Sequence, residues 1–161
     1  MEHLFNVKLE DKEELPMLKP QDIMIGDYLL ADGKVIQVAA VHQKKVGYHN
    51  VPNKLTWVRL DRLEYIIITH ETLRAFGFEK TEPDGWTFNN AWEFRAENLT
   101  REEGSPFILS WKDDDGERSY RVTCRGYGET AFFSHDAISE LQHFFYQYTN
   151  GNVMPIEYVK P

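Results

Sequence analysis

The first half of the chain alternates short apolar runs with turn residues, a pattern typical of β-strands joined by tight turns. Asp32-Gly33 has the composition of a two-residue hairpin turn. Five short strands in roughly fifty residues suggest a small, strongly bent sheet, and we predict an SH3-like β-barrel. The predicted strands are 28–30, 34–41, 46–48, 55–60 and 63–67.

Residues 63–80 join the last of these strands to a short helix. Tyr65 to Ile68 is a mostly β-branched apolar run, which we predict to be a strand buried on both faces. Thr69 suits a helix N-cap, and Gly77 suits the left-handed residue that ends a helix in a Schellman motif. We therefore place the boundary between two modules just before Thr69.

Beyond residue 80, segments that alternate aromatic with polar side chains predict a β-meander with an acidic hairpin tip at Asp113–Gly116. Its strands are predicted at 78–80, 86–88, 91–95, 107–111, 120–124 and 130–133. Apolar residues at every third or fourth position then predict a C-terminal amphipathic helix over Asp136–Tyr148, with Ser134 as its N-cap. The predicted fold class is α+β with mostly antiparallel strands. Its parts are a charged N-terminal arm at 1–16, an SH3-like β module at 17–68 and an α+β module at 69–161.

The chain of 161 residues carries a net charge of −8, and that charge is unevenly placed. Residues 1–80 carry 11 basic and 12 acidic side chains, whereas residues 81–161 carry 7 basic and 14 acidic ones. An acidic protein does not favour non-specific binding to nucleic-acid phosphates. Residues 34–62 are the exception, because their basic side chains are opposed only by Asp61.

This basic stretch, with aromatic side chains interleaved, is the best candidate for a binding surface. Small β-barrels bind peptides or nucleic acids through such strands. The alternative is a solvated face whose lysines only keep edge strands soluble. The candidate binding residues are Lys44, Lys45, Tyr48, Trp57, Arg59 and Arg62.

A second group of aromatic side chains follows the predicted meander. Strand alternation favours a place in the core, although such rings would equally suit a recognition face or a homodimer interface. The group consists of Trp86, Phe88, Trp92, Phe94 and Trp111.

Motifs for catalysis or metal binding are weak in this sequence. The six histidines form no His-Glu-x-x-His helix and no paired Cys/His zinc spacing. Cys124 is the only cysteine, so an intramolecular disulfide is excluded. Of the histidines, only His135 and His143 lie where they could approach Cys124 to form a catalytic or metal-binding Cys-His pair. The acids at 113–115 lack the spacing of a calcium loop. We expect no cofactor and no metal, and an enzyme is the third alternative.

The longest apolar run, Tyr65–Ile68, is far too short to span a bilayer. The start of the chain also lacks the charged and apolar regions of a signal peptide. We expect a cytoplasmic protein without a membrane partner.

Three segments carry motifs in a fixed order. Leu18–Tyr28 is similar to a start of the form "RIGNwV", Leu63–Lys80 to "EPIPLTeewLlkfGFek", and Ile138–Gly151 to "HeLQnlyyaLTG". Together they resemble a group of uncharacterised proteins that are abundant in gut Bacteroidales, often within phage and mobile-element regions. The resemblance implies a cytoplasmic accessory protein of prophage or mobile-element origin, and it implies no catalytic residue.

The chain departs from these motifs at Tyr65 and Ile67 around the usual proline, at Ser139 in place of the usual histidine, and by an inserted Asn150. The weak catalytic motifs and the aromatic-rich β architecture lead us to expect a non-enzymatic binding or adaptor protein. Its partner would be a protein or peptide. The alternative is a nucleic-acid-binding accessory protein that uses the basic face of the β module.

Overall fold

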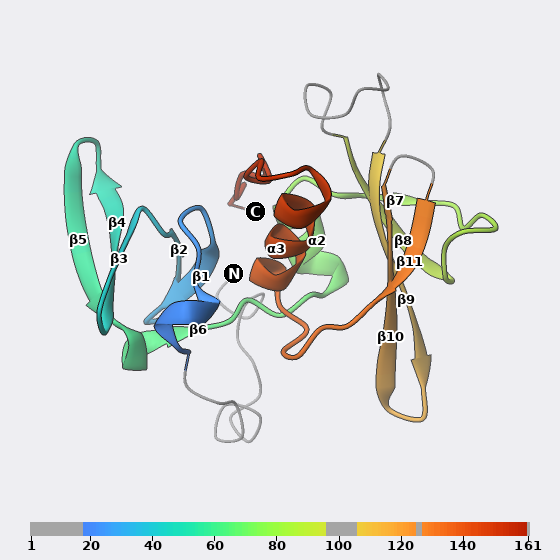
Figure 1. Ribbon diagram of the computed structural model, residues 1–161, viewed down its shortest axis with the longest axis horizontal. Coiled ribbons are helices and arrows are strands. Elements are labelled where there is room, and N and C mark those ends of the chain that lie inside the picture. The colour runs from blue at the N-terminus through green and yellow to red at the C-terminus, as the bar shows by residue number, and fades with distance from the viewer. Residues whose placement is uncertain (1–17, 96–105, 125–126, 161) are drawn as a thin grey trace. The chain divides into compact units, whose positions relative to one another are not determined.

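The computed structural model describes residues 18–95, 106–124 and 127–160 (Figure 1). The predicted arm at 1–16 lies outside these residues. Contacts divide the chain into two units, and each is described by itself. The first runs to Thr72 and includes His135–His143, and the second comprises Leu73–Ser134 and Phe144–Pro161. The predicted class is confirmed, since the described residues form an α+β protein with antiparallel sheets and two α-helices.

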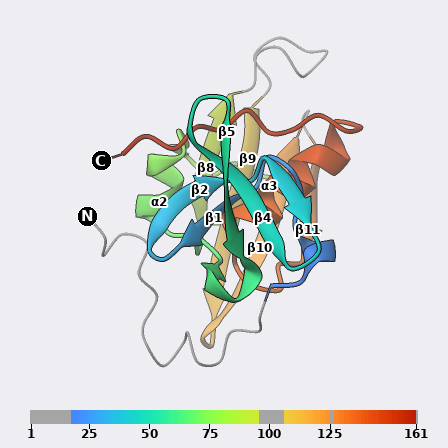
Figure 2. The same cartoon turned by 90° about the vertical axis from the view of Figure 1, so that its left-hand side faces the viewer.

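The first unit contains two three-stranded antiparallel sheets, with the orders β2-β1-β6 and β3-β4-β5. Figure 2 shows β4 and β5 in front of β1 and β2. The Asp32-Gly33 turn joins β1 to β2, and both of its residues have positive φ, as a two-residue hairpin turn requires. The elements are η2 Pro20–Asp22, β1 Tyr28–Ala31, β2 Lys34–Gln37, β3 Ala40–His42, β4 Lys45–Val51, β5 Lys54–Arg59, η3 Leu60–Arg62 and β6 Leu63–Glu64.

Among the described residues these strands do not close into the predicted barrel, because the chain changes sheets between β2 and β3. The backbone N–H of Val38 donates to the carbonyl of Asp27, beside the first sheet, over 2.8 Å. The next residue, Ala39, donates to the carbonyl of Gly47 in β4, also over 2.8 Å. Strands that pass from one sheet to another make such corners. The single strand predicted at 34–41 is therefore two strands.

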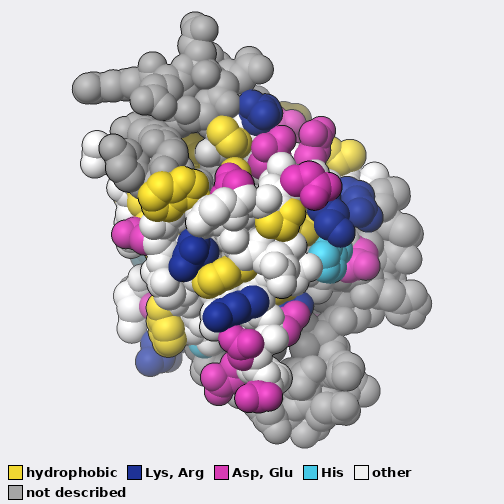
Figure 3. Space-filling model, turned by 90° about the vertical axis from the view of Figure 1, so that its right-hand side faces the viewer, with side chains coloured by type: hydrophobic (Ala, Val, Ile, Leu, Met, Phe, Trp, Pro, Cys, Tyr) yellow, Lys and Arg dark blue, Asp and Glu magenta, His cyan; other side chains and the backbone are white. Residues whose placement is uncertain are grey.

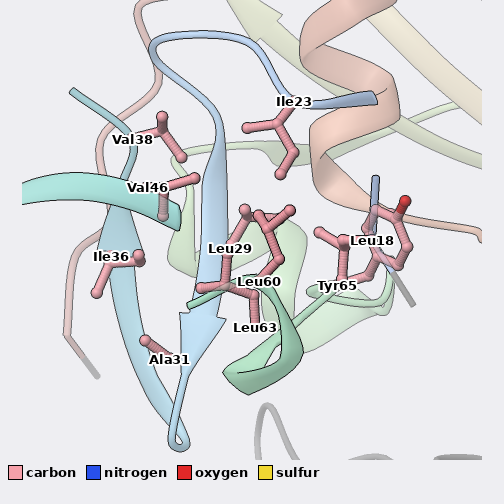
Figure 4. Close-up of a cluster of buried hydrophobic side chains, with 11 residues drawn as sticks. Leu18, Ile23, Leu29, Ala31, Ile36, Val38, Val46, Leu60, Leu63 and Tyr65 are labelled. Carbon is pink, nitrogen blue, oxygen red and sulfur yellow. The ribbon is translucent and has the colours of Figure 1, made fainter. Parts of the chain in front are cut away.

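A cluster of buried apolar side chains forms the core of the first unit. Figure 4 shows Leu29 and Leu60 at its centre, with Ile36 and Val46 to one side. Burial of each such side chain contributes about 1.5–3 kcal/mol to folding. The cluster also contains Leu18, Ile23, Ala31, Val38, Leu63, Tyr65 and Ala137.

The apolar run Tyr65–Ile68 is largely buried, as predicted, but it does not continue the strand that precedes it. Instead, the N–H of Ile138 donates to the carbonyl of Ile66 over 2.8 Å. The N–H of Ile68 donates to the carbonyl of Asp136 over 2.7 Å. The backbone of the run is therefore paired with residues far along the chain.

Helix α2 (His70–Ala75) begins and ends as predicted. The Thr69 hydroxyl accepts from the N–H of Thr72 over 3.0 Å, and the Thr72 hydroxyl accepts from the N–H of Thr69 over 2.8 Å. This is the reciprocal arrangement of a capping box, with threonine in place of the usual acid or amide. Gly77 has a φ of 89°, and the following N–H donates to the carbonyl of Leu73 over 3.0 Å, which completes a Schellman motif.

Helix α3 (Ile138–Tyr148) begins two residues later than predicted, and Ser134 is not its N-cap. Asp136 has a φ of 51°, so its backbone is left-handed and cannot belong to the helix. The cap comes from within the first turn, where the Glu140 carboxylate accepts from the N–H of Ala137 over 3.2 Å.

The side chain of Gln142, on α3, is buried and forms two hydrogen bonds to the start of β1. Its Oε1 accepts from the N–H of Tyr28 over 2.9 Å, and its Nε2 donates to the carbonyl of Gly26 over 2.8 Å. Beside it, Nε2 of His143 lies 2.8 Å from Oδ2 of the buried Asp27. Three consecutive residues before and within β1 are thus held by two consecutive residues of the helix.

The second unit contains the predicted β-meander, a five-stranded sheet of order β11-β10-β9-β8-β7. Trp92 and Trp111 are buried, as their alternation predicted, and the ring of Phe107 lies 5.4 Å from that of Phe145 on α3. The segment 86–88 is a turn and not the predicted strand. On the side of the molecule that Figure 3 shows, Lys and Arg side chains lie beside hydrophobic ones. The strands are β7 Glu79–Thr81, β8 Asn90–Arg95, β9 Pro106–Asp114, β10 Glu117–Cys124 and β11 Tyr127–Ala131.

We predict that Gln142→Ala lowers the free energy of unfolding by about 1–3 kcal/mol, because it removes two hydrogen bonds of a buried side chain, one to the N–H of Tyr28 and one to the carbonyl of Gly26. Gln147→Ala is the matched control, since Gln147 is an exposed glutamine of the same helix and should change stability by less than about 0.5 kcal/mol. Urea titration followed by circular dichroism measures both. Equal effects of the two substitutions would contradict the role of Gln142.

Tyr65 gives a second prediction, on alkaline stability. Burial, followed by the nearby carboxylates of Asp22, Glu140 and Asp27, raises the pKa of Tyr65 to about 12. Between pH 10 and 12 the unfolded chain has lost the phenolic proton that the native chain keeps, so stability falls as pH rises through this window. Tyr65→Phe should lose less stability than the natural chain between pH 9 and 11 in urea titrations. Parallel losses in the two proteins would refute the assignment.

Candidate binding surface

Side-chain alternation gives the β3-β4-β5 sheet an inner and an outer face. On the inner face, Val46 lies opposite Val58 and Tyr48 opposite Thr56, and the valines pack with the core. On the outer face, Lys45 lies opposite Arg59, Gly47 opposite Trp57 and His49 opposite Leu55. We call these six residues and His42, which lies opposite Lys45, the outer face.

Trp57 lies at the centre of the outer face, and 42% of its surface is exposed. The absence of a side chain at Gly47 makes room for the indole, since a Cβ there would lie 3.3 Å from two ring carbons of Trp57. Nζ of Lys45 lies 4.9 Å from the centre of the ring, within the range of a cation–π interaction. The ring of His42 approaches edge-on at 6.4 Å. The indole is therefore positioned by neighbours while one side remains accessible.

The six candidate residues do not share one face. Lys45, Trp57 and Arg59 lie together on the outer face. Tyr48 lies on the inner face, half-buried against the core. Lys44 lies in the turn between β3 and β4, and Arg62 in η3.

Two of the six candidates are paired with carboxylates. Nη2 of Arg59 lies 2.5 Å from Oδ2 of Asp61, and Nη2 of Arg62 lies 2.8 Å from Oδ2 of Asp32. All four side chains are largely exposed, so each pair contributes little to stability. Both pairs reduce the positive charge of the surface. Counting charges over residues 34–62 included Asp61 but missed Asp32, which lies outside that stretch.

Two clefts of about 540 Å³ border the candidate residues. One is lined by Tyr48, Thr56 and Val58 from the inner face and by charged groups that include Lys34 and Arg62. The surface of the other is mainly apolar, and Lys44 and Arg59 are among its lining residues. Lys34 was not among the six candidate residues from the sequence. The one signal for it was its position directly after the predicted Asp32-Gly33 turn, at the start of the basic stretch.

The histidines that could have formed a reactive set have other contacts. His143 is bound to Asp27, as described, and the ring of His135 is stacked on Tyr65 at 4.5 Å. Both histidines belong to the first unit, whereas Cys124 is buried in the second. No group of three potential metal ligands occurs in the part of the chain that the structure describes.

The second unit has an exposed aromatic side chain of its own. Trp86 is 56% exposed in the turn before β8. The neighbouring Phe88 lies close to two cations, since Nζ of Lys112 is 5.3 Å and the guanidinium carbon of Arg121 is 4.4 Å from the centre of its ring. Trp86 provides a control for Trp57, because both are exposed tryptophans but they belong to different units.

Comparisons with protein families, curated proteins and solved structures found no match to this chain. Among the described residues, no helix is both long enough and apolar enough to cross a membrane.

We predict that Gly47→Ala displaces the Trp57 indole by a few tenths of an ångström, because the added methyl group would lie 3.3 Å from the ring. The indole N–H resonance of Trp57 in a ¹H–¹⁵N spectrum should move, with a change in stability of about 1 kcal/mol or less. Gly85→Ala is the control, since a Cβ at Gly85 meets no atom within 4 Å. An unmoved Trp57 resonance in Gly47→Ala would contradict this packing.

Proposed function

We propose that the protein is a non-enzymatic binding protein whose first unit binds a protein or peptide on the outer face, with Trp57 at the centre of the contact. The observation that carries this proposal is the exposed indole itself, positioned over Gly47 and beside Lys45. Tryptophan is among the residues that most often dominate the energy of protein interfaces. A ring that is already positioned loses little conformational entropy when a partner covers it.

The composition of the outer face suits a protein partner better than a phosphate backbone. Leu55 and Trp57 supply exposed apolar surface, and His42 and His49 supply polar groups at its border. Such a mixture of an aromatic centre and a polar rim is usual in transient protein interfaces. The pairing of Arg59 with Asp61 leaves less free positive charge than phosphate binding requires.

The module that carries this face is of the SH3-like type. Support comes from its short strands, from the single-turn helix η3 that separates β5 from β6, and from the bend at Val38 and Ala39. A strand that bends from one sheet into another gives two small sheets packed around one core.

Single-stranded nucleic acid is the second candidate partner. The observation that favours it is the cation–π pair of Lys45 and Trp57, because bases stack on exposed aromatic rings beside cations. The net charge of −8 opposes it.

We expect a phage-displayed library of random peptides to yield binders of the natural protein, and Trp57→Ala to weaken the best of them by at least about tenfold. Trp86→Ala should leave their affinity unchanged. Fluorescence anisotropy of synthetic peptides gives the dissociation constants. A selection in which every binder keeps its full affinity for Trp57→Ala would contradict the proposal. Binding of oligo(dT) at low salt that depends on Trp57, without any peptide selected, would favour the second candidate.

A further inference from the structure

A third cleft, of about 430 Å³, runs along one edge of β2. Part of its lining is an unbroken run of residues from Lys34 to Ala39, which includes all of β2. Another part comes from Tyr48, His49 and Asn50 of β4, and Ile25 lies at one end with 62% of its surface exposed. The volume is in the range of sites that bind ligands.

The edge of β2 has backbone groups available for another strand. β2 is the outermost strand of its sheet, and its only paired neighbour among the described strands is β1. In the ladder with β1, Ala31 faces Lys34 across a two-residue turn, so the hydrogen-bonded pairs are those of Lys34 and Ile36. The N–H and C=O groups of Val35 and Gln37 therefore point away from β1, toward the cleft. This alternation is what an added strand requires.

The cleft also has a preference in charge. Nζ of Lys34 lies 2.8 Å from Oδ1 of Asn50 and 5.8 Å from the centre of the Tyr48 ring. The side chain of Lys34 therefore extends from β2 to β4. Its partner Asn50 is neutral, so a carboxylate in the cleft would add an attraction between opposite charges that the Asn50 amide does not supply. Lys34 and Tyr48 also line the neighbouring cleft, where Arg62 is paired with Asp32, so Lys34 is the cation that selects for charge here.

We infer that this cleft binds an extended acidic peptide, which adds as a strand to the free edge of β2 and places a carboxylate on Lys34. The inference rests on the proposed function for the class of partner, a protein or peptide, but it uses a different surface from Trp57. Val35 and Gln37 supply the backbone hydrogen bonds. Lys34 supplies the charge selection, and Ile25 contacts an apolar side chain at one end of the peptide.

The test is a selection of random eight-residue peptides on three purified proteins: the natural chain, Lys34→Glu and Lys54→Glu. Lys54 is an exposed lysine of β5 that does not line this cleft, so it controls for net charge. We expect acidic residues to be enriched on the natural chain and on Lys54→Glu, and basic residues to replace them on Lys34→Glu. The leading acidic peptide should bind Lys34→Glu at least about tenfold more weakly. Lys34→Gln, which keeps the length of the side chain without its charge, should give an intermediate affinity.

Strand addition has its own signature. N-methylation of the leading peptide at alternate residues should abolish binding in one register and be tolerated in the other, because only every second N–H faces β2. Peptides that tolerate N-methylation everywhere, or an acidic preference that persists on Lys34→Glu, would overturn the inference. Selection on Trp57→Ala separates the two proposals. If acidic peptides are still selected on Trp57→Ala, the β2 cleft binds them independently of the outer face. If Lys34→Glu leaves peptide affinity unchanged and Trp57→Ala abolishes it, peptides bind only the outer face, and the inference about the cleft is wrong.

Discussion

The contact on which the first unit depends is made by residues that are 114 positions apart. Gln142 accepts a hydrogen bond from the N–H of Tyr28 and donates one to the carbonyl of Gly26, and His143 contacts Asp27 between them. On the side of β1 that faces away from β2, β6 pairs only with Leu30 and Ala31, so at Tyr28 a side chain of the helix takes the place of a neighbouring strand. The first unit is therefore incomplete without a segment that the chain supplies near its end.

A short series of hydrogen bonds connects the start of β1 to both proposed binding surfaces. The carbonyl of Asp27 accepts from Val38, and the adjacent Ala39 donates to Gly47. Gly47 in turn lies beneath the indole of Trp57. Residues that fix the start of β1 thus also fix the end of β2, the bend between the sheets and the floor of the outer face. A rigid framework of this kind suits a recognition surface, because little ordering is left to occur on binding.

The candidate site was predictable only in part. Composition identified the basic and aromatic stretch, and alternation along β5 placed Trp57 and Arg59 on one face. The position of Tyr48 on the opposite face depends on register, which a hydrophobic pattern fixes only where one face is fully buried. Lys34 lies beside Asn50 because the chain bends between the two sheets, and no pattern of residues near Lys34 indicates that bend.

What the sequence determined by itself is the local structure: the hairpin turn at Asp32-Gly33, the cap at Thr69, the helix stop at Gly77 and the meander with its buried tryptophans. The turn, the cap and the helix stop rest on hydrogen bonds or steric limits between residues a few positions apart, and these act whatever the rest of the chain does. The meander was predictable because each of its strands carries its own alternation of apolar and polar residues. Tertiary structure determined which strands lie at the edges of their sheets. It also determined that α3 begins only after the left-handed Asp136, and that the first half of α3 belongs to the first unit. Those outcomes depend on pairings between distant segments, because a backbone group takes whichever partner the whole fold brings within reach.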